Sequence, residues 1–113
     1  MEIIDRIEDG YVVLDIQSDM LEYPKTMVLK NHVMHLLQDG HQRFVMNLSK
    51  VEMLDSFGIA SFISILKLCK SKNGNLTLYG LNQPVMHLME LTHMDRVLDI
   101  WETEGQAVSQ VKS

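Results

Sequence analysis

A predicted strand that leads through a short polar turn into a predicted helix limits the fold of this chain most. In residues 43–48 the side chains of Phe44, Met46 and Leu48 fall on one face, which is typical of a strand. After the turn, apolar residues recur at helical spacing, with Cys69 expected on the same side: Ile59, Phe62, Ile63 and Leu66. Lysines gather toward the end of this helix, where cations complement the helix dipole. The segment therefore predicts one strand–helix unit of an α/β fold.

The rest of the chain repeats this alternation. The dipeptide Asp9-Gly10 favours a tight hairpin turn between strands at residues 2–8 and 11–16. In the second of these strands only the face that carries Leu14 is expected to be deeply buried. Later segments predict two more strands, at 76–79 and 97–101, and three more helices, at 25–38, 84–90 and 103–111. This order calls for parallel strands joined by right-handed crossovers, beside an opening antiparallel hairpin.

The composition favours a globular protein that binds other proteins. With 113 residues, 46% of them apolar, the chain is long enough to bury a core, and we expect one domain over residues 1–113. The net charge of −5 argues against nucleic acid or an anionic membrane as partner, and favours a basic protein surface. Cys69 is the only cysteine, which excludes an internal disulfide and favours the cytoplasm. No apolar run approaches the roughly 20 residues that span a bilayer, and the sequence starts without a signal-peptide pattern.

The turn before the predicted helix at residue 56 contains the candidate functional groups. Asp55 or Ser56 is expected at the start of the helix, where an oxygen side chain accepts a hydrogen bond from unpaired backbone N–H groups. Because the same N–H groups favour an anion, a phosphate on the Ser56 hydroxyl would lie at the positive end of the helix dipole. It would add nearly two negative charges beside Asp55. The alternative is that Ser56 is only a helix cap.

The residues of this turn resemble a known family signature. Leu54-Asp55-Ser56 followed by Gly58-Ile59 is similar to the Asp-Ser-Ser-Gly-Leu motif of the STAS domain, in the branch of bacterial anti-sigma factor antagonists such as SpoIIAA and RsbV. Two later segments also resemble the family, so that the likeness covers nearly the whole chain: Asn73-Gly74-Asn75-Leu76 and Leu91-Thr92-His93-Met94. The sequence departs from the pattern at Phe57, where a second serine is usual, and at His93, where a glycine is usual.

The resemblance implies the STAS fold, an α/β architecture with a mixed, mostly parallel sheet, helices packed mainly on one side and an opening β-hairpin. It also implies that Ser56 is phosphorylated by a partner serine kinase that is an anti-sigma factor, and is dephosphorylated by a PP2C-like serine phosphatase. The chain would then be a phosphorylation-switched regulatory binding protein that is active when Ser56 is unphosphorylated. The partner-binding residues expected on this basis surround the serine: Met53, Asp55, Ser56, Phe57 and Gly58.

Two alternatives keep the STAS fold and change the output. A stand-alone regulator would act on a target other than an anti-sigma factor, in stress or biofilm-type signalling. A structural scaffold would use Ser56 only as a helix cap. Phosphopeptide mass spectrometry of Ser56 separates the scaffold from the switch.

Patterns for catalysis, cofactors and metals are missing from the sequence. The residues around Ser56 do not form the Gly-x-Ser-x-Gly elbow of a hydrolase, and no glycine-rich phosphate loop is present. A receiver domain phosphorylated on Asp55 is another alternative. Receiver domains resemble one another in having a lysine after the fifth strand, whereas here that strand runs into Glu102. His32 and His35 share a predicted helix face but lack a third ligand at a telling spacing. We therefore expect a binding protein without enzymatic activity, cofactor or metal.

Overall fold

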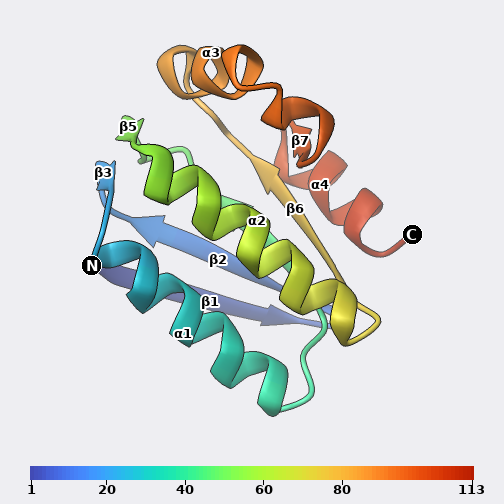
Figure 1. The fold of residues 1–113 in the computed structure, drawn as a ribbon. Helices are drawn as coiled ribbons and strands as arrows, with labels where there is room; N and C mark the ends of the chain where they lie inside the picture. Colours follow the sequence, from blue (N-terminus) through green and yellow to red (C-terminus); the bar gives the residue numbers. More distant parts are fainter.

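A computed structural model describes residues 1–113 as a five-stranded sheet that is covered by helices (Figure 1). The strands are β1 (Glu2–Glu8), β2 (Tyr11–Gln17), β4 (Arg43–Asn47), β6 (Asn75–Tyr79) and β7 (Asp99–Trp101), and they lie in the order β1-β2-β4-β6-β7. The helices are α1 (Lys25–Gln38), α2 (Ser56–Ser71), α3 (Gln83–Leu91) and α4 (Glu104–Val111). Only β1 and β2 are antiparallel. The predicted α/β class, with its mostly parallel sheet and opening hairpin, is confirmed.

The main core lies between the sheet and three of the helices. Leu14 of β2 and Phe44 of β4 are fully buried in it, together with Leu29 of α1, Phe62 of α2 and Met89 of α3. The helices α1, α2 and α3 therefore cover one face of the sheet, as the resemblance to the STAS fold implied. Because parallel strands must be joined by crossovers, each connection carries one of these helices back over the same face.

The prediction that only one face of β2 is deeply buried is wrong. Val13, which points away from the main core, is fully buried with Val45 and Ala107 in a second, smaller core under α4. The helix α4 begins at a capping box, in which the Thr103 side chain and the Gln106 side chain each bond the other residue's backbone N–H. The second face of β2 is therefore buried as well, because α4 packs against Val13 and its neighbour on β4, Val45.

A network of four polar side chains connects α4 to the sheet. Arg6 of β1 donates hydrogen bonds to Asp15 of β2 and to Glu104 of α4, and the Tyr79 hydroxyl donates to Glu104 at 2.7 Å. The hydrogen bonds from Arg6 hold the pKa values of Asp15 and Glu104 below their usual range. Burial, and after it the hydrogen bond to Glu104, raises the pKa of Tyr79. This network connects three strands with the last helix.

Two short strands form a second sheet that the sequence did not predict. β3 (Met20–Leu21) and β5 (Met53–Leu54) pair in parallel. Strands of two residues are too short to show an alternating pattern, so periodicity could not reveal them. The strand predicted at 97–101 is also shorter than expected and begins at Asp99, because a 3₁₀ helix at Met94–Arg96 precedes it.

The buried side of α2 differs in part from the predicted stripe. Phe62 and Cys69 are fully buried as predicted, and burial raises the pKa of the Cys69 thiol to about 12. Ile65, which lay outside the predicted stripe, is also fully buried. The other predicted residues are only partly buried: Ile59, Ile63 and Leu66. The buried stripe of α2 therefore comprises Gly58, Ser61, Phe62, Ile65 and Cys69, and the predicted apolar flank stays near the surface.

Candidate functional site

The side chain of Asp55 caps the start of α2. The Asp55 backbone is extended, with φ −103° and ψ −172°, and its Oδ1 accepts a hydrogen bond from the Gly58 N–H at 3.0 Å. An N-cap residue has this geometry, because it precedes the helix and satisfies an N–H group that lacks a partner inside it. Of the two residues that the sequence allowed for this role, Asp55 is the cap.

Ser56 is the first residue of α2, and its exposed side chain makes no hydrogen bond within the protein. The interpretation of Ser56 as a helix cap is therefore wrong. A capping side chain belongs to the residue with extended backbone before the helix, and Ser56 already belongs to the first helical turn. Its hydroxyl is left free at the positive end of the helix dipole. The scaffold alternative, in which Ser56 only caps the helix, loses its structural basis.

The segment before Ser56 is held by the small sheet. The Asp19 carbonyl oxygen, just before β3, accepts hydrogen bonds from the Glu52 N–H at 2.8 Å and from the Met53 N–H at 3.1 Å. Met53 then pairs with Met20 of β3. Met53 therefore belongs to a strand and not to an open turn, although its side chain is 53% exposed.

Gly58 is buried beneath this small sheet. A Cβ atom added to Gly58 would lie 2.9 Å from the Leu21 carbonyl oxygen and 2.9 Å from the Leu54 Cβ. A side chain at this position would therefore push the first turn of α2 away from β3 and β5. Among the predicted partner-binding residues, Met53, Ser56 and Phe57 reach the surface, whereas Gly58 allows the helix to pack closely.

Phe57 and Tyr23 form an exposed aromatic pair at the start of α2. Their ring centroids are 5.9 Å apart, and the two residues are 58% and 60% exposed. Exposed aromatic side chains are enriched at protein–protein interfaces and often carry much of the binding energy. The two rings line a shallow groove between α1 and α2, together with Thr26, Met27, Lys30, Ala60, Ser61 and Ser64. Sequence reasoning missed Tyr23, since only the tertiary structure brings it against Phe57.

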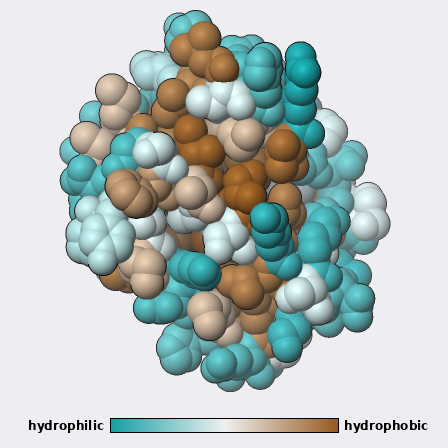
Figure 2. Space-filling view, in the orientation of Figure 1, coloured by the Kyte–Doolittle hydropathy of each residue, from teal (hydrophilic) through white to brown (hydrophobic).

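Met53 borders a second groove, between β5 and α3. This groove has a volume of about 330 Å³ and is mostly apolar, with Leu91 of α3 66% exposed. It is lined by Met53, Leu54, Pro84, Val85, His87, Leu88 and Leu91. Figure 2 shows a band of hydrophobic side chains on this face of the molecule, between α2 and α3. Ser56 therefore lies between two residues that line different grooves: Phe57 lines the groove between α1 and α2, and Met53 lines the groove between β5 and α3.

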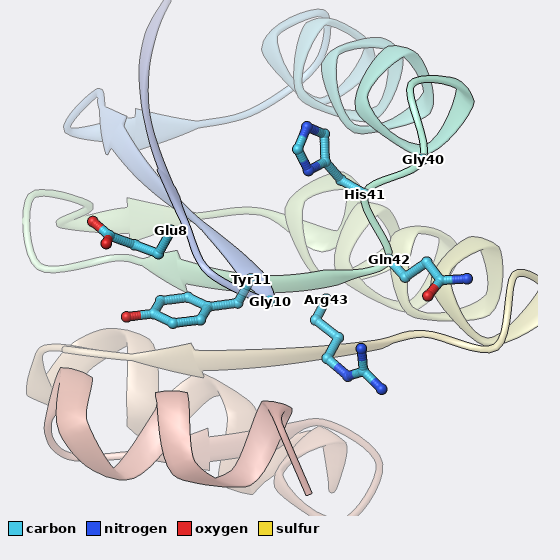
Figure 3. Close-up of a pocket in the computed structure, with 7 residues that line it drawn as sticks. All are labelled: Glu8, Gly10, Tyr11, Gly40, His41, Gln42 and Arg43. Atoms are coloured by element: carbon cyan, nitrogen blue, oxygen red, sulfur yellow. The ribbon is translucent and has the colours of Figure 1, made fainter.

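A polar hollow at the opposite end of the sheet does not form a comparable site. It lies beside the β1–β2 turn, where seven residues surround a volume of about 200 Å³ (Figure 3). Glu8 and Tyr11 point to one side in this view, whereas Gln42 and Arg43 point to the other. Because these side chains do not converge on one point, they do not present a set of groups to a ligand.

The two histidines of α1 do not act together. His32 Nε2 lies 2.7 Å from Asp5 Oδ1 of β1, whereas His35 is exposed. Nowhere in the protein do three or more His, Cys, Asp or Glu side chains come close enough to hold a metal ion. None of the helices combines the length and the apolar character that a membrane span requires.

The fold and the site define a class of small α/β proteins in which an exposed serine follows a capping aspartate at a helix start. Comparison with known proteins gives this class its name. The model of the STAS domain matches residues 1–107. A putative anti-sigma factor antagonist from Thermotoga maritima is 30% identical over 108 residues, which are 95% of each chain. The chain therefore belongs to the STAS domain family, in the branch of proteins named anti-sigma factor antagonists.

Solved structures agree with this assignment. The crystal structure of a putative anti-sigma factor antagonist from Thermotoga maritima superimposes with a TM-score of 0.86 at 28% identity, over 98% of this chain and 95% of that one. A structure of Bacillus SpoIIAA in its phosphorylated form gives a TM-score of 0.71 at 12% identity, over 97% and 99% of the two chains. At that identity the second likeness concerns the fold alone.

Proposed function

We propose that this protein is an anti-sigma factor antagonist that acts as a phosphorylation-switched binding module, with Ser56 as the modified residue. The observation that carries the proposal is the free Ser56 hydroxyl at the exposed start of α2, flanked by exposed Met53 and Phe57. Relatives that align along almost their whole length carry the name anti-sigma factor antagonist, which supports the same role here.

In the unphosphorylated state, the partner covers the surface around Ser56. Met53 and the Tyr23–Phe57 pair supply apolar area that is already exposed in the free protein. Burial of such area on a partner contributes roughly 25 cal/mol per Å² before the costs of association. The acidic protein, with a net charge of −5, fits a partner surface that carries basic groups around an apolar centre.

Phosphate on Ser56 breaks this contact. It adds nearly two negative charges beside the carboxylate of Asp55. At the apolar centre of the contact the partner surface offers no matching cation, so burial of the phosphate there costs several kcal/mol. Because each 1.4 kcal/mol changes a dissociation constant about tenfold, a micromolar complex becomes mostly dissociated.

The chemistry of the switch is supplied by other proteins. A serine kinase that is itself the anti-sigma factor adds the phosphate, and a PP2C-like serine phosphatase removes it. The chain, one STAS domain over residues 1–113, binds in the cytoplasm without catalysing a reaction and without a cofactor. The capping Asp55 and the exposed Ser56 give the kinase a fixed backbone with a free hydroxyl.

To test the proposal, the serine kinase is first recovered with the parent chain as bait. Its affinity for the parent chain and for three variants is then measured. Ser56→Ala should bind as the parent does, and Ser56→Glu should bind at least about tenfold more weakly. Ser109→Glu is the control. Ser109 is exposed on α4, on the other side of the sheet, and this substitution adds the same charge there. Equal affinity of Ser56→Glu and the parent would contradict the proposal.

A further inference from the structure

The side chain of Asn82 bonds two segments that are far apart in the sequence. Its Oδ1 accepts a hydrogen bond from the Val85 N–H at 3.0 Å and so caps the start of α3. Its Nδ2 donates to the carbonyl oxygens of Val51 and Glu52, at 3.2 and 3.3 Å. Both ends of the amide group are therefore used, one on α3 and one on the segment that leads to Ser56.

The segment held by Asn82 comprises residues 51–55, which we call the docking segment. On its other side, the N–H groups of Glu52 and Met53 donate to the Asp19 carbonyl oxygen. The docking segment thus lies between two hydrogen-bonding partners, Asn82 and Asp19. It carries the exposed side chain of Met53 and ends at Asp55, the cap of α2.

We infer that Asn82 is a positioning residue for partner binding, which fixes the docking segment in the conformation that the partner recognises. This inference rests on the proposed function. A partner binds only the fraction of molecules whose docking segment has the right conformation, so its apparent affinity falls by that fraction when the segment is released. Asn82 keeps that fraction high and links the position of Met53 to that of α3.

The chemistry of the asparagine side chain fits both tasks, whereas capping alone does not require it. Asparagine, aspartate and serine are about equally good N-cap residues, because each offers an oxygen acceptor. Only the amide also offers two N–H donors. Aspartate at position 82 would present a second oxygen to the carbonyls of Val51 and Glu52, so that the contact becomes repulsive. Substitutions at this position therefore separate the cap from the link to the docking segment.

The experiment uses the full chain with Asn82→Asp, Asn82→Ser and Asn82→Ala. All three variants should unfold at a lower temperature than the parent, because each loses the hydrogen bonds to Val51 and Glu52, and Asn82→Ala should lie below Asn82→Ser, because only alanine also removes the cap. Hydrogen exchange at the amides of Glu52 and Met53 should approach the rate of an unprotected amide in all three variants, because a tenfold fall in the competent fraction leaves the docking segment released in about nine molecules out of ten. The affinity for the serine kinase recovered with the parent chain should fall about tenfold in all three.

Thr103→Ala is the matched control. Thr103 caps α4 and lies away from the docking segment, so this variant should lower stability and leave both the exchange of Glu52 and Met53 and the partner affinity unchanged.

Two outcomes would overturn the inference: unchanged exchange and affinity in Asn82→Asp, or a loss of affinity in Asn82→Ala alone that follows its stability. If exchange is faster in Asn82→Asp while Ser56→Glu and the parent bind equally well, Asn82 still positions the docking segment. The same result would count against the phosphorylation switch, so the two proposals fail separately.

Discussion

The Oδ1 atom of Asp55 lies 3.0 Å from the backbone nitrogen of Gly58 and accepts its hydrogen bond. This contact fixes the first turn of α2 without any help from Ser56. The serine next to it is therefore free for modification, and its loss should not weaken the helix. In the proposed function, stability depends on Asp55 and regulation on Ser56, so that mutations can separate the two.

Asp55→Ala should lower the free energy of unfolding by about 1 kcal/mol, because it leaves the Gly58 N–H without its capping acceptor. Ser56→Ala should change the same quantity by less than about 0.5 kcal/mol, as expected for an exposed side chain without partners. Urea denaturation of both variants and the parent measures the difference. A larger loss in Ser56→Ala than in Asp55→Ala would mean that the serine caps the helix after all.

Incubation with ATP, magnesium and the partner kinase should place phosphate on Ser56, and the chain alone should not label itself. Two other hydroxyl groups, those of Ser61 and Thr92, are engaged in hydrogen bonds and are less available to a kinase. The Ser61 hydroxyl is buried and donates to the Gly58 carbonyl at 2.7 Å, and the Thr92 hydroxyl donates to the Leu88 carbonyl at 2.8 Å. Fragmentation mass spectrometry locates the phosphate, and its recovery on Ser49 or Thr92 would speak against the assignment of the site.

Tyr23→Ala and Phe57→Ala should each weaken partner binding by more than about 1 kcal/mol, because paired exposed aromatic residues are typical binding hot spots. Neither change should strongly affect unfolding, since both residues are more than half exposed. Met34→Ala is a suitable control, because Met34 is an exposed apolar residue of α1 that lines neither groove. Equal losses in all three variants would indicate a general apolar effect and no defined surface.

Gly58→Ala should lower the free energy of unfolding by about 1–3 kcal/mol, because its Cβ would meet backbone and side-chain atoms of β3 and β5 at 2.9 Å. Gly105→Ala is the control within a helix. Apart from its chain neighbours and the backbone of α4 itself, nothing lies within 4 Å of the Cβ that it would add, so it should be neutral or stabilising, by up to about 1 kcal/mol. Thermal unfolding of the two variants distinguishes close packing at Gly58 from a general effect of glycine in helices.

Acid should weaken the attachment of α4. The pKa values of Asp15 and Glu104 lie below their ordinary values of 3.8 and 4.5, so both carboxylates favour folding while they are ionised. Their contribution is fully present above the ordinary values, and it is lost as the pH falls through the lowered ones. Unfolding measured from pH 7 down to pH 2 should show less of this acid-dependent loss in Arg6→Gln. A parallel pH profile in this variant and the parent would rule out Arg6 as the cause.

The elements whose signals are local could be predicted from the sequence. Asp9-Gly10 defines the first hairpin, and Gly10 takes the positive φ of +90° that this tight turn requires. The helix α1 spans Lys25–Gln38, as its apolar spacing and the flanking Pro24 and Gly40 predicted. The motif around Asp55 and Ser56 was enough to indicate the STAS family. All of these features depend on residues that are neighbours in the chain.

The tertiary structure decided the features that depend on distant segments. Whether Asp55 or Ser56 caps α2 follows from the backbone angles at one residue, which β5 and its pairing with β3 help to set. The contact of Tyr23 with Phe57 and the hydrogen bonds of Asn82 join residues about 30 positions apart, a separation that no local pattern encodes. An apolar stripe on α2 was predicted, but which of its residues are fully buried depends on the sheet and the helices that pack against it.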